Sequence, residues 1–149
     1  MTAPPTLPAI AQLLPHRPPM VLLDEVVSFA AEGITCSALV RASCLFVQDG
    51  QLATAVTIEH MAQAIAAHEG MRASAGQGPI DIGFLISCRE MLVHQDWIQV
   101  GSVLTVRARC VSSARGLGNF ACRAELGGVC VSEAELSVAS PELVREWQS

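Results

Sequence analysis

Residues 54–73, TAVTIEHMAQAIAAHEGMRA, decide the fold of this chain. Apolar residues recur in this stretch at helical spacing, and alanines occupy several of its other faces. The pattern predicts one long helix, with Thr54 or Thr57 as its N-cap. Because a helix that is apolar on more than one side must be covered by other structure, we expect this helix to be a buried central element.

The sequence on both sides of this helix favours strands and turns. The expected elements are a short helix at 7–14, strands at 20–29 and 34–41 in a hairpin, a loop at 42–53 with a turn at Asp49-Gly50, strands at 82–93, 103–111, 119–126 and 129–138, and a helical turn after Pro141. The last two strands are joined by Gly127-Gly128, a two-residue hairpin turn. This order predicts a single α+β domain over residues 1–149, in which an antiparallel sheet wraps around one helix.

The composition excludes several classes of chemistry. Of the 149 residues, 51% are hydrophobic and 15% charged, and the net charge is −5. All nine basic residues are Arg, and Lys and Tyr are absent, which excludes a Schiff base, a phosphate-binding loop that ends in Lys, and phenolic acid–base catalysis. The negative charge argues against nucleic-acid partners. Without a long apolar run or a signal-peptide pattern, we expect a cytoplasmic location and no membrane partner.

The cysteines and histidines favour neither disulfides nor a metal. Six Cys are present without a Cys-x-x-Cys pair, so we expect free thiols and no structural zinc site. His60 and His68 lie eight residues apart, about 80° around the helix, which does not suit a shared metal ion. His94 is expected at the surface near a strand end. Neither Cys44 nor Cys88 is favoured as a nucleophile.

Glu59 is the leading candidate for a functional side chain. It lies in the first turns of the apolar helix, where it is either an exposed residue favoured by the helix dipole or a carboxylate in an apolar crevice suited to acid–base work. Gln63 follows one turn later and is placed to orient the Glu59 carboxylate by a hydrogen bond. His16, between Pro15 and Arg17, is either a structural residue that holds the N-terminal segment or a second member of the site.

Two segments carry a family resemblance. Residues 14–24, LPHRPPMVLLD, and residues 58–63, IEHMAQ, resemble the 3-hydroxyacyl-acyl carrier protein dehydratases of the hotdog fold, in particular the divergent dehydratase-like proteins of aryl polyene biosynthesis. Weaker similarity continues at 82–85, IGFL, and at 99–104, QVGSVL. The four segments occur in the family's order and spacing, so the resemblance covers nearly the whole chain.

This resemblance implies an architecture and a set of partners. The fold would be a hotdog, with an antiparallel sheet of six or seven strands wrapped around one long central helix. Two units would pair, as a homodimer or as a heteromer with a second dehydratase, and would enclose an acyl tunnel. The substrate would arrive on the phosphopantetheine arm of an acyl carrier protein, with no metal or redox cofactor. Because carrier proteins are acidic, some Arg side chains should gather near the tunnel mouth.

The resemblance also implies a chemistry and exposes a departure from it. In the family a His removes the α-proton of the 3-hydroxyacyl thioester, and a helix carboxylate, matched here by Glu59, assists loss of the hydroxyl. Leu45 occupies the position of that His, while Thr54 and Ile86 stand where the family has glycines. Three accounts follow: His16 or another His replaces the base, Glu59 works alone as in hotdog thioesterases, or the chain is a catalytically silent acyl-binding partner subunit.

Overall fold

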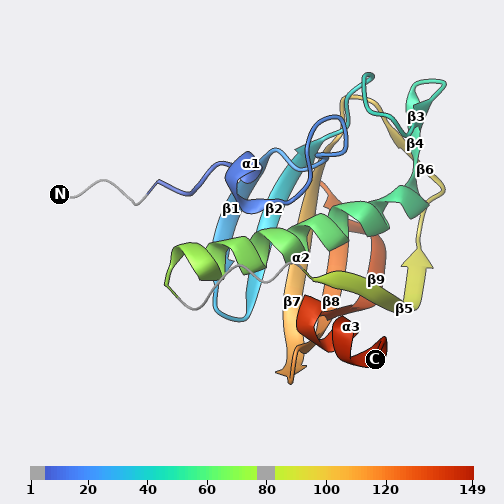
Figure 1. The fold of residues 1–149 in the computed structure, drawn as a ribbon. Helices are drawn as coiled ribbons and strands as arrows, with labels where there is room; N and C mark the ends of the chain where they lie inside the picture. Colours follow the sequence, from blue (N-terminus) through green and yellow to red (C-terminus); the bar gives the residue numbers. More distant parts are fainter. Residues whose placement is uncertain (1–5, 77–82) are drawn as a thin grey trace.

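The computed structural model of the chain describes residues 6–76 and 83–149. Its helices are α1 (Ile10–Leu13), α2 (Thr57–Ser74) and α3 (Pro141–Trp147), and a 3-10 turn, η1 (Thr54–Val56), leads into α2. Its strands are β1 (Glu25–Ala30), β2 (Gly33–Leu39), β3 (Val47–Gln48), β4 (Gln51–Ala53), β5 (Phe84–Val93), β6 (Trp97–Gln99), β7 (Val103–Ala114), β8 (Leu117–Leu126) and β9 (Val129–Ala139). In Figure 1 the long helix α2 lies across one face of the main sheet.

Six of the strands form one sheet, in the order β1-β2-β7-β8-β9-β5, and all its neighbours are antiparallel. The sheet curves around α2 (Figure 1). The prediction of an antiparallel sheet wrapped around one helix is therefore confirmed. Strand β5 lies at one edge of this sheet, although it directly follows the helix in sequence. No helix in the described ranges is long and apolar enough to span a bilayer.

The core lies between α2 and the inner face of the sheet. Met61, Ala64 and Ala67 of the helix are fully buried, and strand residues such as Val106 and Leu136 meet them from the sheet. The buried strand positions alternate along β2, β7 and β8, as expected when one sheet face is covered. Small side chains on α2 allow the helix to lie close to the strands.

Helix α2 also packs closely against α1. A Cβ atom at Gly70 would lie 2.7 Å from the carbonyl oxygen of Leu13 and 3.0 Å from its Cα atom. Glycine is therefore the residue that permits this approach. Through this contact α1 covers a side of α2 that the sheet does not cover.

A small second sheet was not expected. Strands β3, β4 and β6 form it, with Leu52 opposite Ile98, in a region predicted as loop and strand end. Each strand has only two or three residues, too few to show an alternating pattern. The predicted turn at Asp49-Gly50 is present, and its positive φ angles of 54° and 75° fit a type I′ hairpin turn.

Several predicted boundaries were wrong. Helix α1 has four residues rather than eight, β1 begins at Glu25 rather than at residue 20, and β7 continues to Ala114. Met20 and Leu22 do not join the sheet, because their backbone groups bond to the side chain of Gln63. The expected strand start at residue 82 lies outside the described residues.

The threonine N-cap prediction was also wrong. The N-cap of α2 is Val56, and no side chain caps the helix there. The hydroxyl of Thr57 instead donates to the Thr54 carbonyl at 2.6 Å and lies 2.6 Å from the Ser132 hydroxyl on β9. The 3-10 turn at 54–56 extends the helix backwards, and Thr57 anchors the start of the helix to the sheet through Ser132.

Candidate active site

The start of α2 brings Glu59, Gln63 and His16 together. The Gln63 side-chain amide donates to Glu59 Oε1 at 3.1 Å, and His16 Nε2 lies 3.4 Å from the same oxygen. The side chains of Glu59 and His16 are 31% and 27% exposed, so both are half-buried and reach solvent. All three predicted site residues therefore meet at one carboxylate oxygen, while their catalytic roles stay predictions.

Gln63 has a fixed orientation. Its side chain is fully buried, its Oε1 accepts from the Leu22 N–H at 2.9 Å, and its Nε2 donates to the Met20 carbonyl at 2.7 Å. Because the oxygen is occupied by a donor, the amide nitrogen must face Glu59. Gln63 therefore aligns the Glu59 carboxylate and also ties the segment before β1 to the helix.

His16 is held by the loop that precedes this segment. Arg17 donates to the carbonyls of Leu14 and His16 at 3.1 and 2.8 Å, so its guanidinium supports its own loop. His16 Nδ1 is buried without a hydrogen-bond partner among the described residues, and Nε2 faces Glu59. His16 also borders a hollow of about 350 Å³ that is lined in part by Val21 and Asp24. The structural and the functional interpretation of His16 are both compatible with this position.

The residue that the resemblance matches to the family's His lies at the surface. Leu45 is 55% exposed on the connection between β2 and β3. Ile86 and Thr54, which the resemblance matches to glycines, are 40% exposed on β5 and fully buried, respectively. Leu45 cannot act as a base, and the imidazole that lies beside Glu59 in this chain is that of His16.

His60 is buried beside the site and is neutral. Burial lowers the pKa of His60 from 6.5 to about 4, against smaller upward effects of the Val56 carbonyl and of Asp24. It borders a small cavity of about 210 Å³, lined also by Leu22 and Cys44. A histidine this hard to protonate is a poor proton donor near neutral pH. His60 therefore belongs to the packing around the site.

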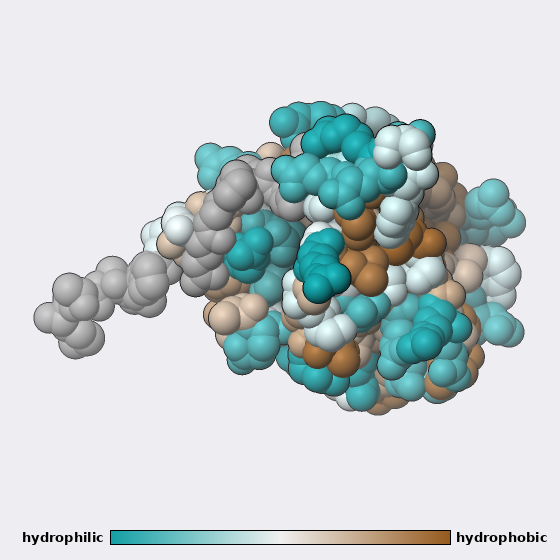
Figure 2. Space-filling model, turned by 60° about the horizontal axis from the view of Figure 1, so that its bottom comes forward, coloured by the Kyte–Doolittle hydropathy of each residue, from teal (hydrophilic) through white to brown (hydrophobic). Residues whose placement is uncertain are grey.

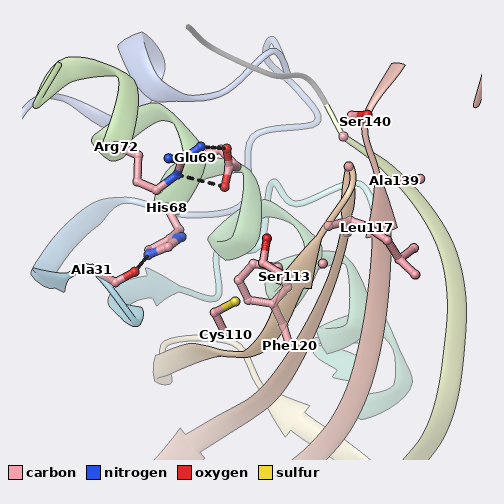
Figure 3. Close-up of a pocket in the computed structure, with 14 residues that line it drawn as sticks. Ala31, His68, Glu69, Arg72, Cys110, Ser113, Leu117, Phe120, Ala139 and Ser140 are labelled. Atoms are coloured by element: carbon pink, nitrogen blue, oxygen red, sulfur yellow. Dashed lines mark hydrogen bonds and ion pairs between the residues drawn. The ribbon is translucent and has the colours of Figure 1, made fainter. Parts of the chain in front are cut away.

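A separate pocket of about 350 Å³ lies near the C-terminal end of α2 (Figure 3). His68 enters it between the rings of Phe29 and Phe120, with its Nε2 3.2 and 3.1 Å from the carbonyl oxygens of Ala30 and Ala31. A neighbouring ion pair joins Arg72 and Glu69 at 2.9 Å. Along the helix axis His68 is about 13 Å from Glu59, so this pocket is distinct from the Glu59 cluster.

All six cysteines are free thiols, as predicted. Burial raises the pKa of Cys36 and of Cys122 to about 12, which makes both thiols unreactive. Cys44 is half-buried and Cys88 is exposed.

Replacing Gln63 by Leu should destabilise the protein. The substitution leaves the buried Leu22 N–H without its acceptor, which costs about 1–3 kcal/mol of unfolding free energy. Urea denaturation of Gln63→Leu beside Gln48→Leu, an exposed position on β3, measures this loss. The control should stay within about 0.5 kcal/mol of wild type. Equal stability of Gln63→Leu and wild type would contradict the anchoring role.

His60 should make the protein less stable in acid. The pKa of His60 is lower in the folded protein than in the unfolded chain. Its contribution to the free energy of unfolding is therefore complete above pH 6.5 and is lost as pH falls toward about 4. The whole contribution is about 3 kcal/mol. The free energy of unfolding, measured from pH 7 to 4.5, should fall more steeply for wild type than for His60→Gln. Parallel curves for the two proteins would rule this out.

Comparisons with known proteins identify the family and the fold of the chain. A family model described as "ApeP-like: ApeP dehydratase" matches residues 8–149. A chain of the dehydratase heterocomplex ApeI:P from Xenorhabdus doucetiae is 25% identical, with a TM-score of 0.88 over 97% of this chain and 100% of that chain.

Two other solved structures show the fold alone. A hypothetical thioesterase with coenzyme A from Streptococcus pneumoniae is 15% identical, with a TM-score of 0.60 over 78% of this chain and 84% of that chain. The PaaI protein of E. coli is 10% identical, with a TM-score of 0.62 over 77% of this chain and 81% of that chain.

The architecture is thus the α+β hotdog fold that the sequence resemblance implied. On the match over residues 8–149, the chain belongs to the ApeP-like dehydratase family of aryl polyene biosynthesis.

Proposed function

We propose that this chain is a subunit of a 3-hydroxyacyl-acyl carrier protein dehydratase, and that a second hotdog subunit completes its active site. The observation that carries the proposal is the Glu59 carboxylate, oriented by Gln63 and half-open to solvent at the start of α2. Membership of a dehydratase family supports the reaction class. Leu45 at the family's His position supports the need for a partner that supplies the missing imidazole.

The proposed reaction removes water from the acyl chain. A base takes the proton from the α-carbon, the C–H electrons form the new double bond, and the bond between the β-carbon and the hydroxyl breaks. Glu59, as the carboxylic acid, gives its proton to the departing hydroxyl, which leaves as water. The base then holds one proton more and Glu59 one fewer. Return of that proton to the carboxylate restores both groups.

His16 acts in this proposal as a positioning residue. Its Nε2 is 3.4 Å from the same Glu59 oxygen that accepts from Gln63. At this distance no substrate fits between the two groups, so His16 is badly placed to take the α-proton from the face opposite Glu59. It is well placed to pass a proton to Glu59 and to hold the carboxylate. The base then has to be an imidazole of the second subunit.

The second subunit has a suitable docking edge in β5. This strand is one of the two edges of the six-stranded sheet, the other being β1, and it exposes Leu85, Ile86 and Leu92 by 40–45%. Figure 2 shows one face of the molecule on which hydrophobic patches break the hydrophilic surface. A long apolar edge strand is a template for pairing with another sheet. We propose that β5 pairs with an edge strand of a second hotdog subunit, and the ApeI:P heterocomplex supports a partner that is not a copy of this chain.

The carrier protein is proposed to approach beside His16. Arg17 lies next to this residue, and Arg41, half-exposed, forms an ion pair of 2.7 Å with Asp24 at the border of the same hollow. Carrier proteins are acidic, so exposed guanidinium groups at this position favour their docking. The acyl chain would then enter from the side on which Glu59 meets solvent.

The main test is dehydration by the complex of this chain with its partner subunit. Glu59→Gln should lower the rate at least about 100-fold, since loss of a general acid typically costs that much. His16→Gln should lower it less and change the pH–rate profile, because His16 acts through Glu59. Intact-mass analysis of 3-hydroxyacyl carrier protein follows the loss of one water. The matched control is Glu69→Gln, on the same helix, which should keep wild-type rates.

Other products would point to other functions. Release of free acid would indicate a thioesterase. Absence of any product with both subunits present would indicate an acyl-binding subunit. Unchanged turnover in Glu59→Gln would remove this residue from the site.

A charge on the β5 edge should separate the subunits. Ile86→Arg places a guanidinium in the proposed interface, where it would be desolvated without a partner charge. Co-expression followed by size-exclusion chromatography with light scattering should show loss of the complex. Val129→Arg, at a 66% exposed position in the β8–β9 hairpin, is the control and should leave the complex intact. A stable complex of the Ile86→Arg protein would exclude this edge.

A further inference from the structure

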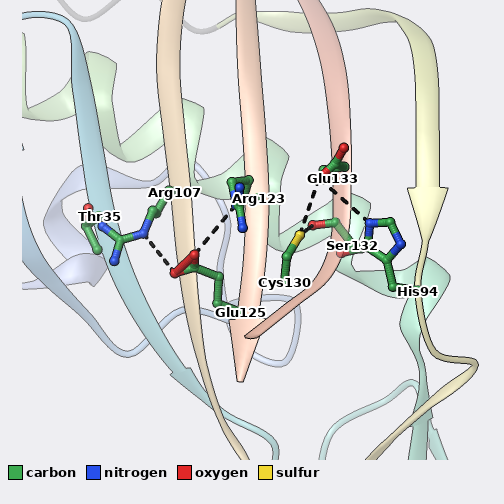
Figure 4. Close-up of polar contacts among 8 residues, drawn as sticks. All are labelled: Thr35, His94, Arg107, Arg123, Glu125, Cys130, Ser132 and Glu133. Atoms are coloured by element: carbon green, nitrogen blue, oxygen red, sulfur yellow. Dashed lines mark hydrogen bonds and ion pairs between the residues drawn. The ribbon is translucent and has the colours of Figure 1, made fainter. Parts of the chain in front are cut away.

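Three metal-binding side chains meet on the outer side of the sheet, apart from the Glu59 cluster. They are His94, directly after β5, and Cys130 and Glu133 of β9 (Figure 4). Glu133 Oε2 lies 3.7 Å from His94 Nε2 and 3.5 Å from Cys130 Sγ, and all three ligand atoms lie within 4.8 Å of one another. Imidazole, thiolate and carboxylate are the three ligand types that zinc accepts.

An irregularity in β9 creates this arrangement. Residues 130 and 133 would point to opposite faces of a regular strand, because their separation is odd. Here Ala124 faces Ser132 and Glu125 faces Cys130, so β9 contains one extra residue, and Val131 and Ser132 are both buried. The bulge therefore turns Cys130 and Glu133 to the same side.

The backbone of His94, the third candidate ligand, is held at the same bulge. The N–H of His94 donates to the carbonyl of Val131, the extra residue of the bulge, at 2.8 Å. Cys130 Sγ donates to the Ser132 carbonyl at 3.3 Å. His94, which follows β5, and Cys130 of β9 are thus both held at one bulge. The hydrogen bonds of the sheet therefore bring the cluster together.

We propose that His94, Cys130 and Glu133 bind a zinc ion. In a tetrahedral zinc site with bonds of about 2.0–2.3 Å, neighbouring ligand atoms are about 3.3–3.6 Å apart. The contacts of 3.5 and 3.7 Å that Glu133 makes are close to this spacing, and the third pair of ligand atoms, on His94 and Cys130, lies within 4.8 Å. His94 and Glu133 are 46% and 40% exposed, which leaves the fourth position open to water.

Without a metal ion, the surroundings of Cys130 favour the protonated thiol. Burial and the contact with Glu133 raise the pKa of Cys130, while the charge of Arg123 opposes this rise. Zinc displaces the thiol proton directly, so binding releases a proton to solvent. Glu125 pairs with Arg123 and Arg107 at 3.6 and 2.9 Å, which separates this acidic side chain from the three ligands.

Bound zinc would join the end of β5 to β9. Because β5 is the edge strand, its attachment to the sheet comes from β9 alone among the described strands. Zinc that binds only the folded state raises the midpoint of thermal unfolding. This consequence does not depend on the dehydratase function.

Cobalt substitution tests the site on the purified full chain. One equivalent of Co²⁺ should give the near-ultraviolet charge-transfer band of a thiolate ligand, and zinc should abolish the band. Cys130→Ser should remove the band and weaken zinc binding at least about 100-fold, since loss of an outer-shell partner alone costs 10–100-fold. His94→Gln should weaken binding as well. Cys88→Ser, the exposed cysteine on β5, is the matched control and should bind as wild type does.

The outcomes separate clearly. A band that depends on Cys130 and His94 but not on Cys88 supports the site. Absence of the band in wild type, or its persistence in Cys130→Ser, overturns the proposal. If Cys130→Ser does not fold, the His94→Gln protein decides, because its exposed side chain contributes no core packing.

Discussion

Burial of most of α2, between the sheet on one side and the N-terminal segment on another, is the constraint on which the rest of this protein depends. A helix with Met61 and Ala64 fully buried on one side and Gly70 pressed against α1 on another cannot exist without the sheet and the N-terminal segment. The hydrophobic free energy gained by covering it is what brings strands from both ends of the chain into one sheet. The chain therefore folds around the helix as a unit.

The Glu59 cluster is a consequence of this burial. Polar groups on a covered helix need internal partners, and Gln63 finds them in the backbone of residues 20 and 22. The same hydrogen bonds that satisfy Gln63 also set the direction of the Glu59 carboxylate. Stability and positioning are thus provided by one amide, while Glu59 itself stays at the point where the helix reaches solvent.

The sequence was most informative for elements that are long enough to show a repeating pattern of apolar residues. The 3.6-residue pattern of the helix and the alternation in β7 predicted the main architecture, and the Gly127-Gly128 turn was predicted from residue type alone. The short strands β3, β4 and β6 lacked enough residues for a pattern. The contact between His16 and Glu59 spans 43 positions, so the sequence could mark each residue as a candidate but could not show that they meet. His94 and Cys130 lie close together because of a bulge in β9, and the spacing of residues in the sequence does not reveal a bulge. No metal site was therefore expected from the sequence.

The free edge of β5 has a consequence for how this protein is maintained in a cell. One edge of this ten-residue strand has no neighbour among the described strands, and with exposed Phe84, Leu85 and Val93 it is an open template for self-association of newly made chains. On the proposed assembly, the partner subunit would act as a solubilising factor before it takes part in any chemistry. The amount of usable protein would then follow the supply of the scarcer subunit, and balanced synthesis of the two chains would matter as much as the catalytic residues of either.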